Sequence, residues 1–421
     1  MIRNKKFAIA VVLILVFTFV LAACGSSPPP ASEPPQTAPP ATTPPADTGG
    51  GGGVQLADYS RDGTSVLDGD PESQGAPQSP EPIIVPVPAG FEDKQWDLKA
   101  NEQGFPDMPM LKFERDAFEH IRVRTNGQVD ITLYDSSTLV PFEAQFASVS
   151  QGTCDITIYL ANFQEGTQPI ADMFQMPTAT ETWDTKTMTK IYRNFVFSND
   201  VFRQENDKAN VEWISIWAFA PAILETTNKP VRTVEDMKGL SLISSNLHIP
   251  YLQEMGATGV VQGIADYYTS LEKGVTDGII THIPITHEFG MTDVLKYHTF
   301  LAPDSDHAGV GSQIQGFLAN QTVWNSIPPE YQAVIKEELF WAADAQAFNN
   351  DNMIQTGIKY MNERGNELIR LSDAEAQKFY DAADVSYQQW LKSATTNGGM
   401  SESDAVDLFD RFIKAIQNKE M

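Results

Sequence analysis

The feature that most constrains this chain is a change of composition near residue 90. Residues 25–90 are rich in proline and contain five consecutive glycines, Gly49 to Gly53, with Tyr59 as their only aromatic residue. A segment with so few large apolar side chains cannot bury enough surface to offset the entropy lost on folding. We therefore predict a disordered tether over residues 24–90 and a folded body over residues 91–421.

The first 24 residues have the pattern of an export signal. Basic residues precede an apolar stretch from Phe7 to Val20, which is short for a membrane span. The stretch runs into Leu-Ala-Ala-Cys, with Cys24 last, and this ending is similar to a bacterial lipobox. We predict a signal peptide over residues 1–23 and a lipid on Cys24 that anchors the protein at the outer face of the cytoplasmic membrane. An uncleaved anchor helix with a chance cysteine is the alternative.

The chain is strongly acidic and has few cysteines. Its 421 residues include 55 Asp and Glu against 29 Lys and Arg, a formal net charge of −26 at pH 7. Nucleic-acid binding requires clustered positive charge, so no nucleic-acid partner is predicted. Two cysteines alone, Cys24 and Cys154, exclude a disulfide-stapled scaffold and a zinc site built on cysteine pairs. Cys154 is predicted to be a small buried residue.

Sequence motifs for catalysis are missing from the chain. It contains no phosphate-binding loop, no dinucleotide-binding glycine pattern after a strand and no G-x-S-x-G motif. His282 and His287 are five residues apart, which misses the four-residue spacing of a zinc-binding pair on a helix. We therefore predict a protein that is not an enzyme and has no catalytic residues, cofactor or metal.

Strand-like and helix-like segments alternate through the body. Apolar residues at helical spacing predict a helix over residues 113–123, and apolar–polar alternation predicts a strand over residues 129–133. Further strands are predicted at 155–159, 211–218, 240–243 and 275–280, and helices at 265–273, 328–361, 373–391 and 403–417. This alternation predicts an α/β fold whose C-terminal part is helical.

Several motifs in the body resemble those of a transporter family. They are TNGQV at residues 125–129, GTCD at 152–155, EDMKGL at 235–240, YTSL at 268–271, GVTDG at 274–278 and IPPEYQ at 327–332. Their order and spacing are similar to those of the DctP-like proteins, the solute-binding subunits of tripartite ATP-independent periplasmic (TRAP) transporters. The resemblance covers about residues 95–392.

This resemblance implies a two-lobed fold like that of periplasmic binding proteins, with a hinge and a ligand cleft between the lobes. Lobe 1 would comprise about residues 95–218 and a return segment, and lobe 2 about residues 219–303 and the C-terminal helices. The chain would cross between the lobes twice, and a long C-terminal helix would brace both. Ligand contacts made only in the closed form shift the population toward it, and membrane permease subunits would recognise that form.

The sequence departs from the family at the expected ligand contacts. The position of the arginine that usually pairs with a ligand carboxylate falls on Ile243, and that of a common asparagine falls on Thr281. A second common arginine falls near Ile223. One interpretation is a ligand that is less charged or more apolar than the usual carboxylates. The other is that a different cation takes over, such as Arg232, Lys229 or a histidine.

Strand ends and aromatic residues supply the candidate ligand-binding positions. Open α/β sheets bind ligands outside the carboxyl ends of their strands, and aromatic rings form flat, rigid walls. The candidates are Tyr159, Asn162, Phe163, Trp217, Phe219, Ile243, Tyr267, Tyr268 and Thr281. For the aromatic candidates, a place in the ordinary hydrophobic core is the alternative.

The sequence as a whole predicts a receptor outside the cytoplasm that captures a small organic compound and delivers it to membrane permease subunits. A receptor that reports to a membrane signalling protein is compatible with the same residues. A surface hydrolase on a similar tether is a further alternative, and it requires titratable groups that converge in the cleft. A purely structural envelope protein would have no cleft.

Overall fold

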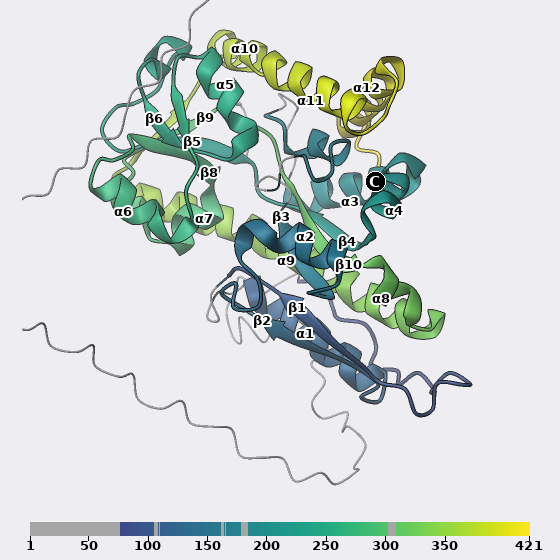
Figure 1. Ribbon diagram of the computed structural model, residues 1–421. Helices are drawn as coiled ribbons and strands as arrows, with labels where there is room; N and C mark the ends of the chain where they lie inside the picture. Colours follow the sequence, from purple (N-terminus) through teal and green to yellow (C-terminus); the bar gives the residue numbers. More distant parts are fainter. Residues whose placement is uncertain are drawn as a thin grey trace, which may run out of the picture. The chain divides into compact units, whose positions relative to one another are not determined.

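The chain forms two β-sheets with helices packed against them (Figure 1). The computed structural model describes residues 76–104, 108, 110–160, 164, 166–177, 184–301 and 309–421. Cys24, the predicted signal peptide and most of the predicted tether lie outside the described residues.

The first sheet has five strands in the order β2-β1-β3-β10-β4. They are β1 (Trp96–Asn101), β2 (Val129–Tyr134), β3 (Ile156–Leu160), β4 (Val211–Ala218) and β10 (Ile314–Asn320). β1 pairs in parallel with β2 and β3, whereas β10 lies antiparallel between β3 and β4. The carboxyl ends of β1, β2 and β3 therefore lie at one edge of this sheet.

The second sheet has six strands in the order β11-β9-β5-β8-β6-β7. They are β5 (Ala222–Thr226), β6 (Ser241–Ile243), β7 (Thr258–Val260), β8 (Gly278–His282), β9 (Tyr297–Phe300) and β11 (Glu367–Arg370). β6 pairs in parallel with β7 and with β8, and β5 is antiparallel to β8 and β9. This sheet also brings the carboxyl ends of three parallel strands to one edge.

Twelve α-helices occur in the described part of the chain. They are α1 (Met110–Arg124), α2 (Gln145–Gln151), α3 (Thr185–Ser198), α4 (Asp200–Ala209), α5 (Ile249–Glu254), α6 (Tyr267–Glu272), α7 (Ile283–Glu288), α8 (Gln321–Ser326), α9 (Pro329–Glu363), α10 (Asp373–Ala382), α11 (Asp384–Thr396) and α12 (Glu402–Gln417). None of these helices combines the length and apolar character needed to cross a bilayer.

Two strand-to-strand connections join the sheets into a two-lobed fold. The chain passes from β4 in the first sheet to β5 in the second, and from β9 in the second back to β10 in the first. The 35-residue helix α9 then contacts α1, α3 and β4 of the first lobe and α7 and β11 of the second. One continuous helix therefore braces both lobes, as expected from the sequence.

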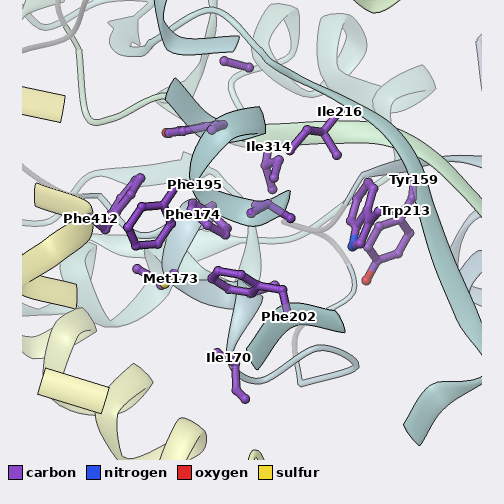
Figure 2. Close-up of a cluster of buried hydrophobic side chains, with 14 of the residues drawn as sticks. Tyr159, Ile170, Met173, Phe174, Phe195, Phe202, Trp213, Ile216, Ile314 and Phe412 are labelled. Carbon is purple, nitrogen blue, oxygen red and sulfur yellow. The ribbon is translucent and has the colours of Figure 1, made fainter. Parts of the chain in front are cut away.

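The core of the first lobe includes a cluster of aromatic rings (Figure 2). The ring centroid of Phe174 lies 5.0 Å from that of Phe412 in an edge-to-face arrangement and 5.3 Å from that of Phe202. Phe412 comes from α12, so the last helix of the chain completes the core of the first lobe. Such aromatic pairs add to the stabilisation from apolar burial.

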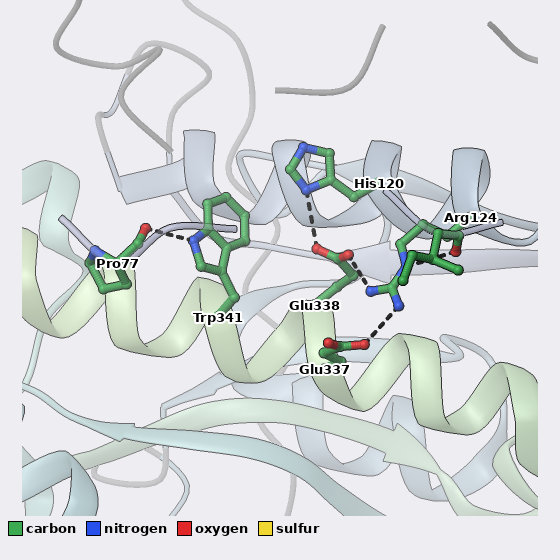
Figure 3. A network of polar contacts seen from close by, with 7 residues as sticks. Pro77, His120, Arg124, Glu337, Glu338 and Trp341 are labelled. Carbon is green, nitrogen blue, oxygen red and sulfur yellow. Dashed lines mark hydrogen bonds and ion pairs between the residues drawn. The ribbon is translucent and has the colours of Figure 1, made fainter. Parts of the chain in front are cut away.

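An ion-pair network fastens α9 to α1 (Figure 3). Glu338 is buried, with its two carboxylate oxygens 2.7 Å from Arg124 Nη1 and 3.1 Å from His120 Nδ1. Arg124 Nη2 lies 2.7 Å from Glu337 on the surface side. Nearby, Trp341 Nε1 donates to the carbonyl of Pro77, which holds the segment before β1 against α9.

The structure confirms most of the predicted elements. α1, β2, β3, β4, α9 and α12 lie where the hydrophobic periodicity placed them. The helix predicted over residues 373–391 is divided at Ala383 into α10 and α11. Cys154 is buried as predicted, and burial raises the pKa of its thiol to about 12.

The interior strand β10 was not predicted, because its sequence does not alternate. Gly316 lies in the middle of the strand, where a Cβ atom would come within 2.3 Å of the carbonyl oxygen of Ser215 on β4. The register between β10 and β4 also shifts between Phe317 and Leu318. The missing side chain of glycine and the bulge allow the two backbones to approach closely here. Both features also weaken the strand pattern in the sequence.

We expect Glu338→Ala to lower the free energy of unfolding by about 3–5 kcal/mol, because it leaves Arg124 buried without its inner partner. Glu337→Ala is the matched control and should cost less than about 1 kcal/mol, since Glu337 is exposed. Urea unfolding of both variants measures the difference, and equal losses would contradict the assigned role of Glu338.

We expect Phe412→Ala to lower the free energy of unfolding by about 3–5 kcal/mol, because the ring is fully buried among other aromatic rings. Asp410→Ala, an exposed change on the same helix, should have an effect within about 0.5 kcal/mol. Thermal or urea unfolding tests this pair. A small effect of Phe412→Ala would show that α12 is not integral to the first lobe.

Candidate functional site

A cavity of about 300 Å³ lies between the two lobes. The first lobe lines it with residues at or just after the ends of β1, β2 and β3, namely Gln103, Ser136, Ser137 and Leu160. The second lobe does the same after β6, β7 and β8, with Ser244, Ser245, Gln262, Thr281 and His282. The parallel strands of both sheets thus direct their carboxyl ends at one space, which is where open α/β sheets bind ligands.

The loop after β2 reaches the cavity in a strained conformation. Ser136 and Ser137 have φ angles of 53° and 54°, in the left-handed region that non-glycine residues seldom adopt. Their backbone N–H groups donate to the carbonyls of Gly104 and Glu102, each over 2.8 Å. The fold therefore holds two adjacent strained residues at the cavity wall, a feature that is typical of functional sites.

Neutral hydrogen-bonding groups face the cavity from the second lobe. The hydroxyl oxygens of Ser244 and Ser245 and the amide nitrogen of Gln262 are buried and have no hydrogen-bond partner within the protein. Gln262 Oε1 accepts a hydrogen bond from Ser270 over 3.3 Å, which leaves its NH₂ group available. Buried polar groups without partners are costly, so these three are well suited to bind a polar ligand group.

Two buried histidines also line the cavity. His282 Nδ1 contacts the carbonyl of Ala220, and its Nε2 lies 3.0 Å from Gln313 Oε1. Burial lowers the pKa of His282 to about 4, and burial together with the charge of His282 lowers the pKa of His248 to about 4. Both imidazoles are therefore neutral at neutral pH, and neither supplies a positive charge to the cavity wall.

Lysine and arginine are absent from the cavity wall in the described part of the chain. Arg232 is exposed and pairs with Glu367 over 2.5 Å, and Lys229 donates to the carbonyl of Asp236 on the surface. The undescribed internal segments contain no Lys or Arg in their sequences either. Of the three replacement cations considered from the sequence, only the histidines lie at the cavity.

A smaller chamber of about 50 Å³ adjoins the cavity. Leu160, Phe219 and Gln315 line both spaces. The deeper wall of the chamber includes Glu102 and Glu114. Burial raises the pKa of Glu102 to about 7 and that of Glu114 well above its ordinary value. Carboxyl groups thus face the chamber in a strongly desolvated environment.

The nine candidate residues from the sequence fall into distinct places. Phe219, Tyr267 and Thr281 line the cavity, and Trp217 lines the smaller chamber. Asn162 and Phe163 lie outside the described residues. Four of the nine candidates therefore lie around the two spaces.

The remaining three candidates lie within or against hydrophobic clusters. Tyr159 is buried between Phe146 and Trp213, with its hydroxyl 2.6 Å from Thr167 Oγ1. Ile243 is fully buried in a cluster of the second lobe, and Tyr268 packs against the same cluster. None of the three lines either space.

Sequence reasoning missed the polar residues that dominate the cavity wall. Ser244 and Ser245 directly follow the predicted strand 240–243, so their position after a strand end was a usable signal. His248 and Gln262 follow β6 and β7, but β7 has only three residues, Thr258–Val260, and its sequence gave no strand signal. Within the described residues, no group of three or more His, Cys, Asp or Glu side chains is arranged to hold a metal ion.

Comparisons with known proteins agree with this architecture. The model of the family "Bacterial extracellular solute-binding protein, family 7" (DctP) matches residues 110–393. The 2,3-diketo-L-gulonate-binding periplasmic protein YiaO of Escherichia coli K12 is 23% identical over 264 residues, which cover 62% of this chain and 76% of YiaO. The C4-dicarboxylate-binding periplasmic protein DctP of Rhodobacter capsulatus is 23% identical over 297 residues, or 69% of this chain and 81% of that protein.

Solved structures share the fold at low sequence identity. A TRAP periplasmic solute-binding protein from Desulfovibrio salexigens with bound orotic acid has a TM-score of 0.66 and 20% identity, and the match covers 76% of this chain and all of that one. A marine metagenome TRAP protein specific for aromatic acids, in complex with 3-hydroxybenzoate, has a TM-score of 0.66 and 22% identity, with 77% and 99% covered.

We expect protonation of His282 to destabilise the folded protein. Its pKa is about 4 in the folded state, below its ordinary value of 6.5, so the unfolded chain binds more protons between these pH values. The free-energy contribution of the neutral ring is therefore present above about pH 6.5 and is lost as the pH falls through about 4. The stability difference between the wild type and His282→Gln should shrink by about 3 kcal/mol over this range.

Urea unfolding at a series of pH values measures this difference. Because the same buried carboxyl groups remain in both proteins, their own pH dependence cancels in the comparison. A stability difference that stays constant from about pH 7 to about pH 4 contradicts the burial of a neutral imidazole.

Proposed function

The chain belongs to family 7 of the bacterial extracellular solute-binding proteins, and we propose that it is the receptor of a TRAP-type secondary transporter. In this role it captures a small organic compound in the interlobe cavity and delivers it to membrane permease subunits. As a member of this family it is an extracytoplasmic solute-binding protein and not an enzyme.

The single observation that carries the proposal is a cavity with walls from two separate sheets. A solute that contacts Ser137 on one side and Gln262 on the other makes its full set of contacts only when the lobes are together. Such a solute shifts the population toward the closed form in proportion to its differential affinity. Phe219 lies on the β4–β5 connection between the lobes and also lines the cavity, so solute and hinge are in direct contact.

The proposed solute is less charged or more apolar than the usual carboxylates of the family. Relatives are named for 2,3-diketo-L-gulonate and for C4-dicarboxylates, and solved neighbours hold orotic acid or 3-hydroxybenzoate. In this chain the cavity wall has no Lys or Arg among its described residues, and both histidines are neutral. A dicarboxylate would leave water without a compensating charge there, whereas Ser244, Ser245 and Gln262 suit a single polar end group.

The proposal includes attachment to the membrane. It takes residues 1–23 as a signal peptide, Cys24 as the lipidated residue and residues 24–90 as a tether for the two-lobed domain over 91–421. The described end of this tether, residues 76–90, departs from the expected disorder: the Pro77 carbonyl accepts a hydrogen bond from Trp341, and the Val85 N–H donates to the Arg124 carbonyl, so this part packs against the domain. Lobe 1 would comprise about residues 95–218 with a return segment, and lobe 2 about 219–303 with the C-terminal helices. An adjacent gene for a sensor kinase in place of permease genes would favour a signalling receptor.

We expect small neutral or singly charged organic compounds to raise the melting temperature more than dicarboxylates do. A ligand at 100 times its dissociation constant adds about 2.7 kcal/mol to the free energy of unfolding. A thermal-shift screen against acids, amides, aromatic compounds and sugars measures this preference. A clear preference for small dicarboxylates contradicts the proposed ligand class, and a complete lack of binding contradicts the proposed function.

Two variants test whether binding occurs in the interlobe cavity. Gln262→Ala removes a free cavity NH₂ group and should weaken binding of the best compound about fivefold, the value of one hydrogen bond. Gln253→Ala changes an exposed residue on α5 and should leave the affinity unchanged. Calorimetric titration of both variants separates cavity binding from binding elsewhere.

A further inference from the structure

The chamber beside the main cavity contains polar atoms that the protein itself does not satisfy. Glu102 Oε2, Glu114 Oε2, Gln346 Oε1 and Trp217 Nε1 are all buried and have no hydrogen-bond partner within the protein. All four residues line the chamber and are at most 4% exposed. They come from β1, α1, α9 and β4 of the first lobe and the segments next to them, so the fold brings them together from distant parts of the sequence.

Burial of the two carboxyl groups is offset only weakly by cations in the described part of the chain. No Lys or Arg is among the described residues that line the chamber. Arg115 lowers the pKa of Glu114 only as a smaller influence, and its guanidinium is partly exposed and pairs with Asp135 over 3.1 Å. Asp135 and Glu102 act in the opposite direction, since the charge of Asp135 raises the pKa of Glu102 and that of Glu102 raises the pKa of Glu114.

The positions of these groups suit a cationic nitrogen. Three unpartnered oxygen atoms, from Glu102, Glu114 and Gln346, are acceptors when the two carboxyl groups are ionised, and an ammonium group has three donors and no acceptor. The rings of Trp217, Phe219 and Phe289 also line the chamber, and aromatic faces attract cations. A space of about 50 Å³ admits a group of this size, because about 10–15 Å³ of such space is enough to hold one water molecule.

We propose that the chamber binds a positively charged nitrogen group of the transported solute, with Glu102 and Glu114 as its counter-charges. The rest of the solute lies in the main cavity, where Ser244, Ser245 and Gln262 bind its polar end. The solute is then a primary amine, an amidine or a zwitterion, and its net charge is zero or positive. This inference rests on the proposed function, because it names the solute class for the same site.

Binding of such a cation is linked to proton release. Glu102 accepts a hydrogen bond from the backbone N–H of Gly104 through Oε1, so Oε2 is the atom that gains the cation as a partner. A cation favours the ionised carboxylate and lowers its pKa from about 7. The affinity for a cation should therefore rise as the pH rises through about 7, since the free protein loses the competing proton.

Two matched pairs of probes test this inference by calorimetric titration. They are benzylamine against benzyl alcohol, and 3-(aminomethyl)benzoate against 3-(hydroxymethyl)benzoate. At about pH 7.5, each pair differs by an ammonium group in place of a hydroxyl. We expect an ammonium compound to bind about tenfold more tightly than its hydroxyl partner, because charge-assisted hydrogen bonds are the stronger ones.

Variants assign the preference to the chamber. Glu102→Gln keeps the size and the contact with Gly104, and it should reduce the preference to about twofold or less and remove its pH dependence. The matched control is Glu288→Gln. Burial raises the pKa of Glu288 to about 7 as well, but this residue lines neither space, so the variant should keep the full preference. Far-ultraviolet circular dichroism verifies that both variants are folded.

Three results overturn the inference while the proposed function stands. They are equal binding of the ammonium and hydroxyl compounds, a preference that survives Glu102→Gln, and binding of acids or neutral compounds by a protein that binds neither ammonium compound. If no compound of any class binds, the proposed function fails and the inference fails with it.

Discussion

Desolvation of the interlobe space is the constraint on which the chemistry of this protein depends. The two sheets direct six strand ends at one cavity. The side chains at and just after these strand ends are thereby buried away from water. Burial then lowers the pKa of His248 and His282 and raises that of Glu102 and Glu114. Each shift favours the neutral form of its group, so the walls present hydrogen-bonding groups in place of fixed charges.

The lobes can hold such a wall because each has its own packed core. Aromatic rings around Phe174 fill the first lobe, and a separate apolar cluster around Leu242 and Ile280 fills the second. The helix α9 contacts both, and its buried Glu338 binds Arg124 and His120 of α1. Several buried polar atoms without partners, such as those of Ser244, Ser245 and Gln262, lie at the interlobe space, where a solute can bind them.

Relatives with the same fold bind different solutes, so the residues of the site, and not the fold, select the solute. The same architecture holds orotic acid and 3-hydroxybenzoate in solved neighbours, so the fold alone does not select a solute. Ile243, the predicted position of the family's usual arginine, belongs to a hydrophobic cluster of the second lobe. The character of the site then comes from the residues just beyond the strands, such as Ser244 after β6 and Gln262 after β7.

The sequence by itself determined the α/β class, the family and the main elements, because periodic apolar patterns and local motifs are properties of neighbouring residues. It also selected Phe219, Tyr267 and Thr281 as candidate ligand contacts, each at or near a strand end or the start of a helix, and these three residues line the cavity. The interior strand β10 was not predictable, since its Gly316 is required by the close approach of a backbone carbonyl on β4, about a hundred residues away in the sequence.

Only the tertiary structure decided which groups meet. Glu102 follows the first strand, Glu114 lies in the next helix and Gln346 belongs to α9, and no local pattern relates them. Their oxygens share one chamber because β1, α1 and α9 pack together. The protonation of the histidines and carboxyl groups was equally hidden in the sequence, since it depends on burial by both lobes and not on the residue type.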